Sequence, residues 1–382
     1  MGIEYATYRG TYRAGVIGHT GRGNYGHGLD AAFVGLPDVQ LVAVADPDDE
    51  GREEAVGRTG AERSYADYRE MLAQENLDLV AIGPRWLDQH EAITIATAEA
   101  GVKAIYAEKP IAPSLEAADR MLAACDKNGV KISYAHQNRA YPAQALVREH
   151  LASGKLGRLR VIRAFGKQDR RGGGMDLLVL GTHMLDLMRH FAGDAHWCHA
   201  HVTRNGRDAT AEDVETAAEE GGLIAGDDVI AQYGFDSGVL GSYECGRAGD
   251  GGGSPYFRME VCGTDGVLAF WSSPDSPIYA FPGPFAPPDR VSEWKTVEPE
   301  PLPPALGPEH PRGGMHTANQ LIVCDLLAAV EEDRAPAMSS GHDTRAALEM
   351  ILSVYESHRR GARVSLPLTE RRHPLARWQS EA

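Results

Sequence analysis

The sequence predicts an α/β protein of two domains, the first built on a parallel sheet and the second, of α+β type, on an antiparallel one. Up to about residue 137, short apolar strands alternate with helices, which is typical of a parallel sheet covered on both faces. Beyond that point several strands follow one another, with turn dipeptides between them and few helices. We therefore place the domains at residues 12–137 and 138–367.

The elements of the first domain follow from its apolar runs and turn signals. A strand at 14–17 leads through a glycine-rich turn into a first helix, and a turn with a short helix is expected at 64–74. Further strands are expected at 41–45, 77–82, 102–107 and 130–134, and further helices at 90–100 and 114–128.

The elements of the second domain are mostly strands. A helix at 142–152 precedes a strand at 159–165, and another helix follows Gly181. The proline-rich stretch 282–311 reads as an extended surface excursion. Strands are then expected at 199–203, 229–235, 239–244, 258–262 and 267–271, and helices at 317–332 and 340–359.

The acidic balance of the chain narrows the classes of function. The 382 residues carry a formal net charge of −16, and ten carboxylates with no Lys or Arg lie between Asp208 and Gly246. A nucleic-acid-binding protein needs a basic face, so we expect no such partner. No apolar run approaches the ~20 residues of a membrane helix, so no membrane partner is expected. Residues 1–13 lack the apolar core of a signal peptide, so we expect a cytoplasmic protein.

The cysteines and histidines predict neither a disulfide framework nor a metal site. The five cysteines are scattered and form no Cys-x-x-Cys pair, which indicates reduced core thiols. Residues 196–201 hold three histidines and Cys198, but neighbouring side chains of a strand point to opposite faces. Four ligands therefore do not converge, and no metal is expected.

The first candidate for chemistry is the glycine-rich segment after the first strand. Such a turn lets the backbone approach the pyrophosphate of a dinucleotide at a helix N-terminus. Asp46 ends the second strand, where its carboxylate can bind the ribose diol of NAD and repel the 2′-phosphate of NADP. We therefore expect NAD as the cofactor, with contacts from Gly18, Thr20, Gly21, Arg22 and Gly23.

The second candidate is Glu108-Lys109-Pro110, directly after the fourth strand. Ligands bind outside the carboxyl ends of the strands in such sheets, so this tripeptide is expected beside the nicotinamide. A lysine in that place is suited to handling the proton of a substrate hydroxyl. The alternative is an exposed lysine in a turn.

The third candidate is the segment 172–187, which begins with three glycines. His183 and Asp186 are three residues apart, on one side of a helix that is otherwise rich in Leu and Met. A histidine in such surroundings is either a satisfied core residue or a site residue. The glycines favour a site, because they let a ligand or another backbone approach closely.

These three segments, in this order, resemble the Gfo/Idh/MocA oxidoreductase family, the relatives of glucose–fructose oxidoreductase and inositol dehydrogenase. The resemblance extends over nearly the whole chain, including residues 64–72 and the ending from 347 to 364. It implies an N-terminal Rossmann domain, a C-terminal domain with an open, mostly antiparallel sheet, and homodimers or homotetramers formed through that sheet. It also implies hydride transfer between a nicotinamide and a sugar or polyol carbon, with cofactor contacts from Pro84, His90, Glu108 and Lys109.

The resemblance also implies roles at the reacting hydroxyl. Lys109 corresponds to the lysine that hydrogen-bonds or deprotonates the substrate hydroxyl, and His183, with Thr182 beside it, to the histidine that assists as acid or base. The family often has an aspartate four residues before that histidine, where this sequence has Val179. Asp176 could replace this aspartate only if the loop is shaped differently.

A basic cluster leads directly into the glycine triplet. Lys167, Arg170 and Arg171 could receive an anionic group on the substrate, since Arg binds carboxylate, phosphate or sulfonate in a fork. The alternative is a solvated loop.

Two enzymatic functions fit these residues. One is an NAD-dependent oxidoreductase acting on a sugar or glycoside, with an anionic sugar as one option. The other is an NAD-dependent glycosidase, which works by transient oxidation, elimination of the aglycone, hydration and re-reduction, and Val179 favours it. A regulatory protein that retains the cofactor without turnover is a third reading, against which Lys109 and His183 argue.

Overall fold

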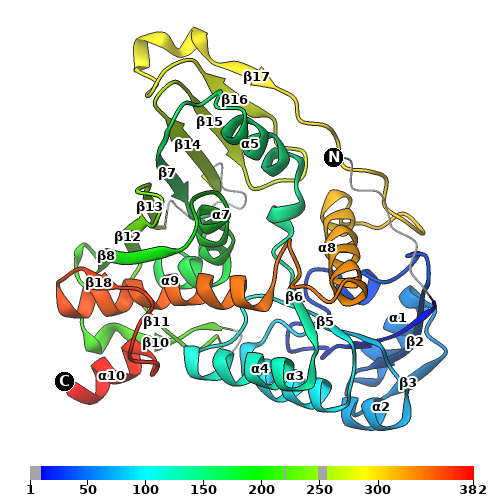
Figure 1. Ribbon diagram of the computed structural model, residues 1–382. Coiled ribbons are helices and arrows are strands. Elements are labelled where there is room, and N and C mark those ends of the chain that lie inside the picture. Colours follow the sequence, from blue (N-terminus) through cyan, green and yellow to red (C-terminus); the bar gives the residue numbers. More distant parts are fainter. Residues whose placement is uncertain (1–9, 219–220, 248–255) are drawn as a thin grey trace. The chain divides into compact units, whose positions relative to one another are not determined.

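The computed structural model describes residues 10–218, 221–247 and 256–382 (Figure 1). These residues divide into two compact units. Among the described residues, unit 1 consists of residues 10–140, Gly221 and Leu302–Arg345, and unit 2 consists of the remainder. Of the predicted acidic stretch, Glu219 and Glu220 lie outside the described residues.

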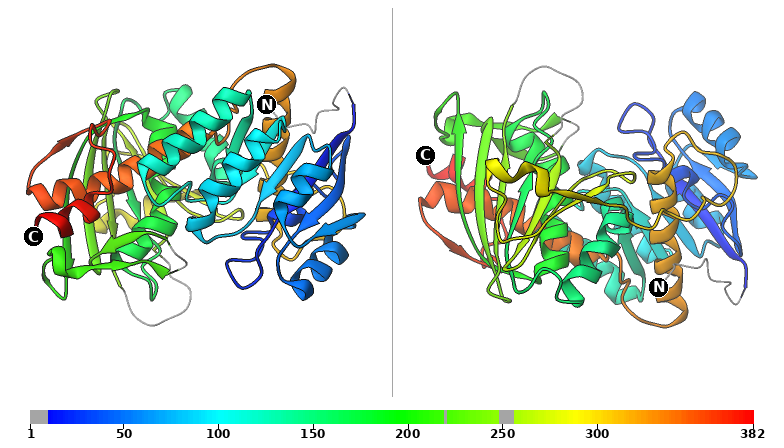
Figure 2. Two further views of the ribbon diagram at one scale, coloured as in Figure 1. Left: turned by 90° about the horizontal axis from the view of Figure 1, so that it is seen from below. Right: turned by 90° about the horizontal axis from the view of Figure 1, so that it is seen from above.

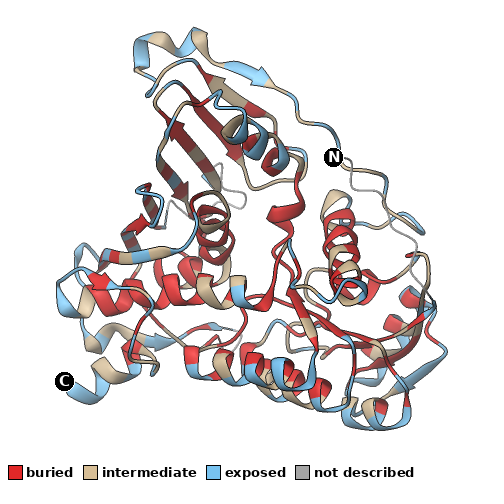
Figure 3. Cartoon of the chain, in the orientation of Figure 1, coloured by how far each residue is buried: buried red, intermediate tan, exposed pale blue. Residues whose placement is uncertain are grey.

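Unit 1 is built on a six-stranded parallel sheet of order β3-β2-β1-β4-β5-β6. Its central strands are the most deeply buried part of the unit, as expected when helices cover both faces (Figure 3). The chain order reverses between β1 and β4, which leaves a crevice at their carboxyl ends. The strands are β1 (Tyr12–Ile17), β2 (Val39–Ala45), β3 (Arg63–Tyr65), β4 (Leu79–Ile82), β5 (Ala104–Ala107) and β6 (Lys131–Tyr134).

The helices of unit 1 begin and end at the expected signals. Ser114 caps the helix that follows it by accepting from the N–H of Ala117 at 3.3 Å, and Gly129 ends that helix with a left-handed φ of 69°. The helices between the strands are α1 (Asp49–Thr59), α2 (Tyr68–Gln74), α3 (His90–Glu99) and α4 (Leu115–Asn128).

The helix expected directly after β1 is absent from the described residues. The chain instead forms consecutive turns and one 3-10 turn at Leu29–Ala31, with bonds such as Val34 N–H to Ala31 O at 3.0 Å. The physical reason is the glycines: Gly23, Gly26 and Gly28 have φ values of 90°, 57° and 83°, which an α-helix does not contain.

The segment Leu302–Arg345 packs with unit 1, whereas the sequence analysis placed it in the second domain. Its helix α8 (Gly314–Glu331) lies against β5 and β6 and is buried along most of its length. Buried Asn319 accepts from Tyr106 Oη at 2.7 Å and from Gln137 Nε2 at 2.9 Å. Part of the proline-rich stretch belongs here too, because Gln320 Nε2 donates to Leu306 O at 2.9 Å.

Unit 2 is built on a ten-stranded sheet that is antiparallel except where β13 runs parallel to β7. A separate hairpin pairs β10 (Val214–Thr216) with β11 (Leu223–Ala225). The strands of the large sheet are β7 (Leu159–Phe165), β8 (Ala195–Arg204), β9 (Arg207–Asp208), β12 (Asp228–Phe235), β13 (Leu240–Cys245), β14 (Arg258–Gly263), β15 (Val267–Trp271), β16 (Ile278–Phe281), β17 (Lys295–Val297) and β18 (Val364–Ser365).

Helices cover one face of this sheet. The part of α9 (Gly341–Arg360) that belongs to unit 2 lies along it, as Figure 2 shows, and accepts from Tyr233 Oη at Met350 O, at 3.1 Å. On the other face, Ile230 is 57% exposed and Leu240 50% exposed. The remaining helices are α5 (Pro142–Ala152), α6 (Gly173–Asp176), α7 (Thr182–Ala192) and α10 (Pro374–Glu381), with a π-helical turn at Leu177–Gly181 between α6 and α7.

Candidate active site

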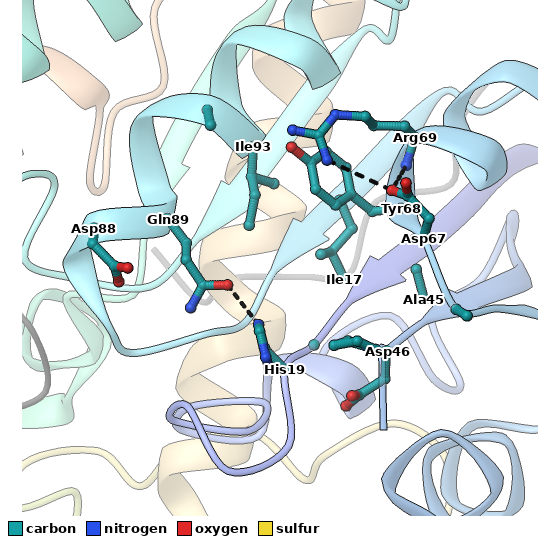
Figure 4. A pocket seen from close by; sticks show the side chains of 14 residues that line it. Ile17, His19, Ala45, Asp46, Asp67, Tyr68, Arg69, Asp88, Gln89 and Ile93 are labelled. Atoms are coloured by element: carbon teal, nitrogen blue, oxygen red, sulfur yellow. Dashed lines mark hydrogen bonds and ion pairs between the residues drawn. The ribbon is translucent and has the colours of Figure 1, made fainter. Parts of the chain in front are cut away.

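Two loops border the crevice at the carboxyl ends of β1 and β4: residues 18–28 after β1 and residues 83–89 after β4. A cavity of about 460 Å³ opens there (Figure 4). Its wall includes His19 from the first loop, Gln89 from the second and Tyr68 and Arg69 from α2. The volume lies within the range of ligand-binding clefts, and the position is where open α/β sheets bind ligands.

Asp46 anchors the glycine-rich loop and also borders this cavity. Its carboxylate is fully buried and accepts from the backbone N–H of Thr20 at 3.0 Å and from Thr20 Oγ1 at 2.9 Å. It also accepts from the N–H of Asp48 at 3.0 Å. The structure therefore uses the predicted ribose ligand to fix the loop, and the sequence pattern does not show this second task.

The glycines of the loop differ in how much room a side chain would have. A Cβ at Gly18 would lie 2.2 Å from the ring of Tyr25, and one at Gly23 would lie 2.4 Å from the backbone nitrogen of Arg85. At Gly21, φ is 82° and no atom lies within 4 Å of the Cβ position. Among these three, Gly21 therefore has the open Cβ position past which a phosphate could approach, while its N–H donates to Asn24 Oδ1 at 2.9 Å.

Arg22 and His19 reach across the crevice to the loop after β4. The guanidinium of Arg22 lies 4.1 Å from the ring centre of Trp86, and its Nη2 is 2.6 Å from Asp88 Oδ2. His19 Nδ1 lies 2.6 Å from Gln89 Oε1, as drawn in Figure 4. Trp86, Asp88 and Gln89 were not singled out from the sequence, because only the tertiary fold brings the two loops together.

Glu108 connects the glycine-rich loop to the candidate catalytic lysine. Its fully buried carboxylate accepts from the backbone N–H and ring of His27, the ring Nδ1 at 2.7 Å, and from the backbone N–H of Lys109 at 3.1 Å. Burial alone would favour the neutral acid, but His27 and Lys109 outweigh it and hold the pKa of Glu108 at about 2. Glu108 therefore holds together the backbone of the glycine-rich loop and that of Lys109, whose side chain is itself nearly buried.

His90 connects the segment after β4 to the segment after β5. It is 1% exposed, with Nε2 2.7 Å from Pro84 O and Nδ1 3.1 Å from Ile111 O. Both ring nitrogens thus lie at backbone carbonyls of the segments that follow β4 and β5. His90 therefore fastens these two segments to each other, and its contact with the cofactor stays a prediction.

Residues far along the chain complete the glycine-rich loop. Asn319 Nδ2 donates to His27 O at 3.1 Å, and Arg312 Nη2 donates to Gly26 O at 3.0 Å. Sequence reasoning missed both, since they lie almost 300 residues from the loop and match no motif. Both hydrogen bonds hold backbone carbonyls of the glycine-rich loop.

His183 lies in unit 2, in the first turn of α7, and is 7% exposed. Its ring makes an edge contact with Phe257 at 6.4 Å between centroids. Thr182 and Asp186 on the same helix are buried. His183 is thus a nearly buried side chain in the first turn of a helix, in contact with an aromatic ring.

Asp176, the candidate to replace the aspartate absent at Val179, holds a turn of the backbone in this structure. It is fully buried and accepts from the backbone N–H groups of Lys167, at 3.2 Å, and Gln168, at 2.6 Å. Burial raises the pKa of Asp176 to about 6, against the opposing effect of these two N–H groups. The π-helical turn at Leu177–Gly181 adds a residue to the helix between Asp176 and His183, so their spacing no longer follows an α-helix.

The basic cluster is partly neutralised within its own turn. Asp169 pairs with Arg171 through two oxygens and lies 3.7 Å from Lys167 Nζ. The hydrogen bond with Arg171 holds the pKa of Asp169 near 2. Arg170 is exposed, so it is the cation of this turn that is most accessible to a substrate anion.

The part of the chain that the structure describes contains no group of three or more His, Cys, Asp or Glu placed to hold a metal ion. The five cysteines are buried and unpaired in disulfides. Among the described helices, none has both the length and the apolar character needed to cross a membrane.

The unit 1 site fits a dinucleotide. Gln89 lines the cavity, and its Nε2 is buried without a hydrogen-bond partner among the described residues, which is typical of a donor that awaits a ligand. Gly21 leaves room for a phosphate, and Asp46 stands at the end of β2. The residues that would hold NAD are thus Gly21, Asp46 and Gln89. Lys109 follows β5, which lies two strands from β1 at the same edge of the sheet.

Comparison with known proteins gives two family matches. Residues 12–136 match the model of the Gfo/Idh/MocA oxidoreductase family, NAD-binding Rossmann fold. Residues 145–269 match a Gfo/Idh/MocA C-terminal domain. The two matches are adjacent and in the order that the sequence predicted.

Individual relatives are dehydrogenases of sugars. The chain is 28% identical over 260 residues to levoglucosan dehydrogenase of Pseudarthrobacter phenanthrenivorans, over 62% of this chain and 65% of that protein. It is 27% identical over 359 residues to D-apiose dehydrogenase of Paraburkholderia graminis, over 90% of this chain and 87% of that protein. The solved structure of a levoglucosan dehydrogenase with NADH and levoglucosan has a TM-score of 0.73 at 23% identity, covering 94% of this chain and 99% of that one.

Proposed function

Since the chain belongs to the Gfo/Idh/MocA oxidoreductase family, with its NAD-binding Rossmann domain, we propose that it transfers hydride between NAD and a hydroxyl-bearing carbon of a sugar. The observation that carries this proposal is Lys109, nearly buried and held by ionised Glu108 at the sheet edge that also bears the cavity. The sugar dehydrogenases among the relatives support the class of substrate.

The roles proposed for the chain follow from this arrangement. NAD, when bound, supplies the hydride acceptor, and the protein orients the substrate and takes its proton. Lys109 hydrogen-bonds the reacting hydroxyl, and His183 of unit 2 assists as acid or base. Glu108 keeps the backbone of Lys109 in place through its 3.1 Å hydrogen bond. Because Asp176 serves the turn at 167–168, no carboxylate is assigned to the hydroxyl.

We propose that the sugar can be anionic, with Arg170 as the residue that binds its acidic group. Lys167 and Arg171 face Asp169, whereas Arg170 is exposed. An Arg170→Ala variant should therefore raise KM for acidic sugars and leave KM for neutral ones unchanged. A KM for acidic sugars that is unchanged from the wild type in this variant would remove the anionic substrate.

The test of the function is a substrate panel with NAD. Free sugars and aryl glycosides, neutral and acidic, are supplied while reduced-nicotinamide absorbance and aglycone release are followed together. Net reduction, lost in Lys109→Met and in His183→Ala, is expected of a dehydrogenase. NAD-dependent aglycone release without net reduction would instead establish the glycosidase. Cofactor binding with neither signal would contradict both.

We also propose a homodimer or homotetramer formed through the large sheet. Ile230 and Leu240 lie on the face that α9 does not cover, in neighbouring strands, and both are at least half exposed. Light scattering on the wild type and on Ile230→Asp with Leu240→Asp tests this. A wild-type monomer would contradict the proposal, as would an unchanged oligomer in the double variant.

A further inference from the structure

The contacts between Arg22 and the loop after β4 lie where a dinucleotide has to cross the sheet edge. Arg22 Nη2 is 2.6 Å from Asp88 Oδ2, and its guanidinium lies over Trp86 at 4.1 Å. Both loops belong to unit 1 and flank the point where the strand order reverses. Dinucleotides bind with their diphosphate at this point, beside the glycine-rich turn.

The neighbours of Arg22 make it a ligand for that diphosphate. Gly21, the residue before it, has the bare backbone a phosphate can approach. A guanidinium is planar and binds phosphate oxygens in a fork, and stacking on an aromatic ring leaves its edge N–H groups available. Trp86 therefore supplies a platform that fixes the plane of Arg22 without using its hydrogen-bond donors.

Asp88 offers the same guanidinium a carboxylate. The side chains of Arg22 and Asp88 are 33% and 42% exposed, so the ion pair is screened by water and weak enough to exchange. Asp88 also lines the cavity, where its negative charge opposes that of a diphosphate. The carboxylate of Asp88 therefore disfavours cofactor binding in two ways: it occupies the guanidinium of Arg22, and it repels the diphosphate.

We propose that Asp88 is an internal competitor of the cofactor: Arg22 pairs with Asp88 before NAD binds and turns to the diphosphate when it does, guided by Trp86. The inference rests on the NAD binding of the proposed function and adds a residue that sets its affinity. Such a device weakens the binding of cofactor and thereby eases its exchange after each turnover.

The expected effects follow from the exposure of the pair. Because exposed ion pairs contribute at most about 1 kcal/mol, Asp88→Asn should tighten NADH binding by about two- to fivefold. Arg22→Gln removes the diphosphate ligand and should weaken NADH binding by about tenfold or more, as for a charged hydrogen bond. Adenosine lacks the diphosphate, so its affinity should not change in either variant.

Isothermal titration of the full-length protein with NADH and with adenosine tests these effects. A matched control is Glu91→Gln, because Glu91 pairs with Arg120 on the surface, with Nη2 3.0 Å from Oε2, and does not line the cavity. This control should bind both ligands like the wild type. Tryptophan emission on addition of NAD should change in the wild type and lose part of that change in Trp86→Phe.

Each other outcome overturns a defined part of the reasoning. If the wild type binds no NADH, the proposed function fails, whatever the variants do. If the wild type binds NADH and Asp88→Asn binds it equally well or less tightly, the competitor is refuted. If Arg22→Gln loses adenosine and NADH affinity alike, Arg22 shapes the loop and is not a diphosphate ligand, which also refutes the proposal.

Discussion

Two glycines of the same loop should respond very differently to alanine. Gly21 and Gly26 both have left-handed φ values, 82° and 57°. A Cβ at Gly21 meets no atom within 4 Å, whereas one at Gly26 would lie 2.1 Å from Glu108 Oε1. Gly21→Ala therefore tests the approach of the cofactor, and Gly26→Ala tests the packing of the loop on Glu108.

The magnitudes follow from these surroundings. A left-handed alanine costs about 1–2 kcal/mol, and this is the whole expected loss of stability in Gly21→Ala. In Gly26→Ala, the carboxylate of Glu108 must also leave His27, and a buried charge that loses its partner costs about 3–5 kcal/mol more. The sum approaches the total stability of many domains, so Gly26→Ala should be largely unfolded or strongly destabilised.

Urea unfolding followed by circular dichroism measures the loss of stability in each variant. Titration with NADH measures the loss of cofactor affinity. We expect Gly21→Ala to unfold close to the wild type and to bind NADH much more weakly, because its methyl group fills the approach to the backbone. Equal destabilisation of the two variants would refute the packing argument. Unchanged NADH affinity in Gly21→Ala would refute the assignment of the open glycine to the phosphate.

Three further predictions concern other residues of the two units. Lys109→Met should lower the rate of hydride transfer by about 10²–10⁴-fold while NADH affinity stays within about threefold, and a large loss of affinity would contradict a role at the hydroxyl. Asp176, with its pKa raised to about 6, should make stability fall by about 2 kcal/mol as pH rises from 4 to 6, a slope that urea titrations should find reduced in Asp176→Asn. Asn319→Ala removes the oxygen that accepts from Tyr106 Oη and Gln137 Nε2 inside unit 1 and should lower the unfolding free energy by about 2–5 kcal/mol, and a smaller loss would mean that water replaces the amide.

The pH dependence of Glu108 has the opposite sign to that of Asp176. Its folded pKa of about 2 lies below the ordinary 4.5, so its contribution to stability is present above pH 4.5 and is lost as pH falls toward 2. Both carboxylates are fully buried. The difference arises because Glu108 faces an imidazole and an ammonium group, whereas Asp176 accepts only from neutral backbone N–H groups alongside the charged residues of its turn.

Most regular elements were predictable because their signals are local. The strand Leu159–Phe165 and the helix Pro142–Ala152 have the predicted bounds, since an alternating apolar pattern and a proline at the first helical position mark them. The prediction of a helix after β1 was wrong, and the reason is again local. Glycines suited to a phosphate turn continue to Gly28, and their left-handed backbone ends helix formation.

The candidate site was predictable as a set of residues and not as a set of contacts. Asp46, His90, Glu108 and Asp176 stand in the expected segments, yet each is fully or almost fully buried and holds a loop in place. A sequence shows which side chains have the chemistry to bind a ligand. It does not show which of their lone pairs the backbone has already taken.

The amino-acid sequence by itself determined the class of the protein: a parallel NAD-binding sheet followed by a mostly antiparallel one, in the order found in an oxidoreductase family. These features depend on periodicity and on short motifs, which neighbouring residues specify. Only the tertiary structure decided that α8 supports the glycine-rich loop, that a π-helical turn separates Asp176 from His183, and that Arg22 meets Asp88. Such pairings join residues that are distant in sequence or shift a helix by one residue, and they follow from packing of the whole chain.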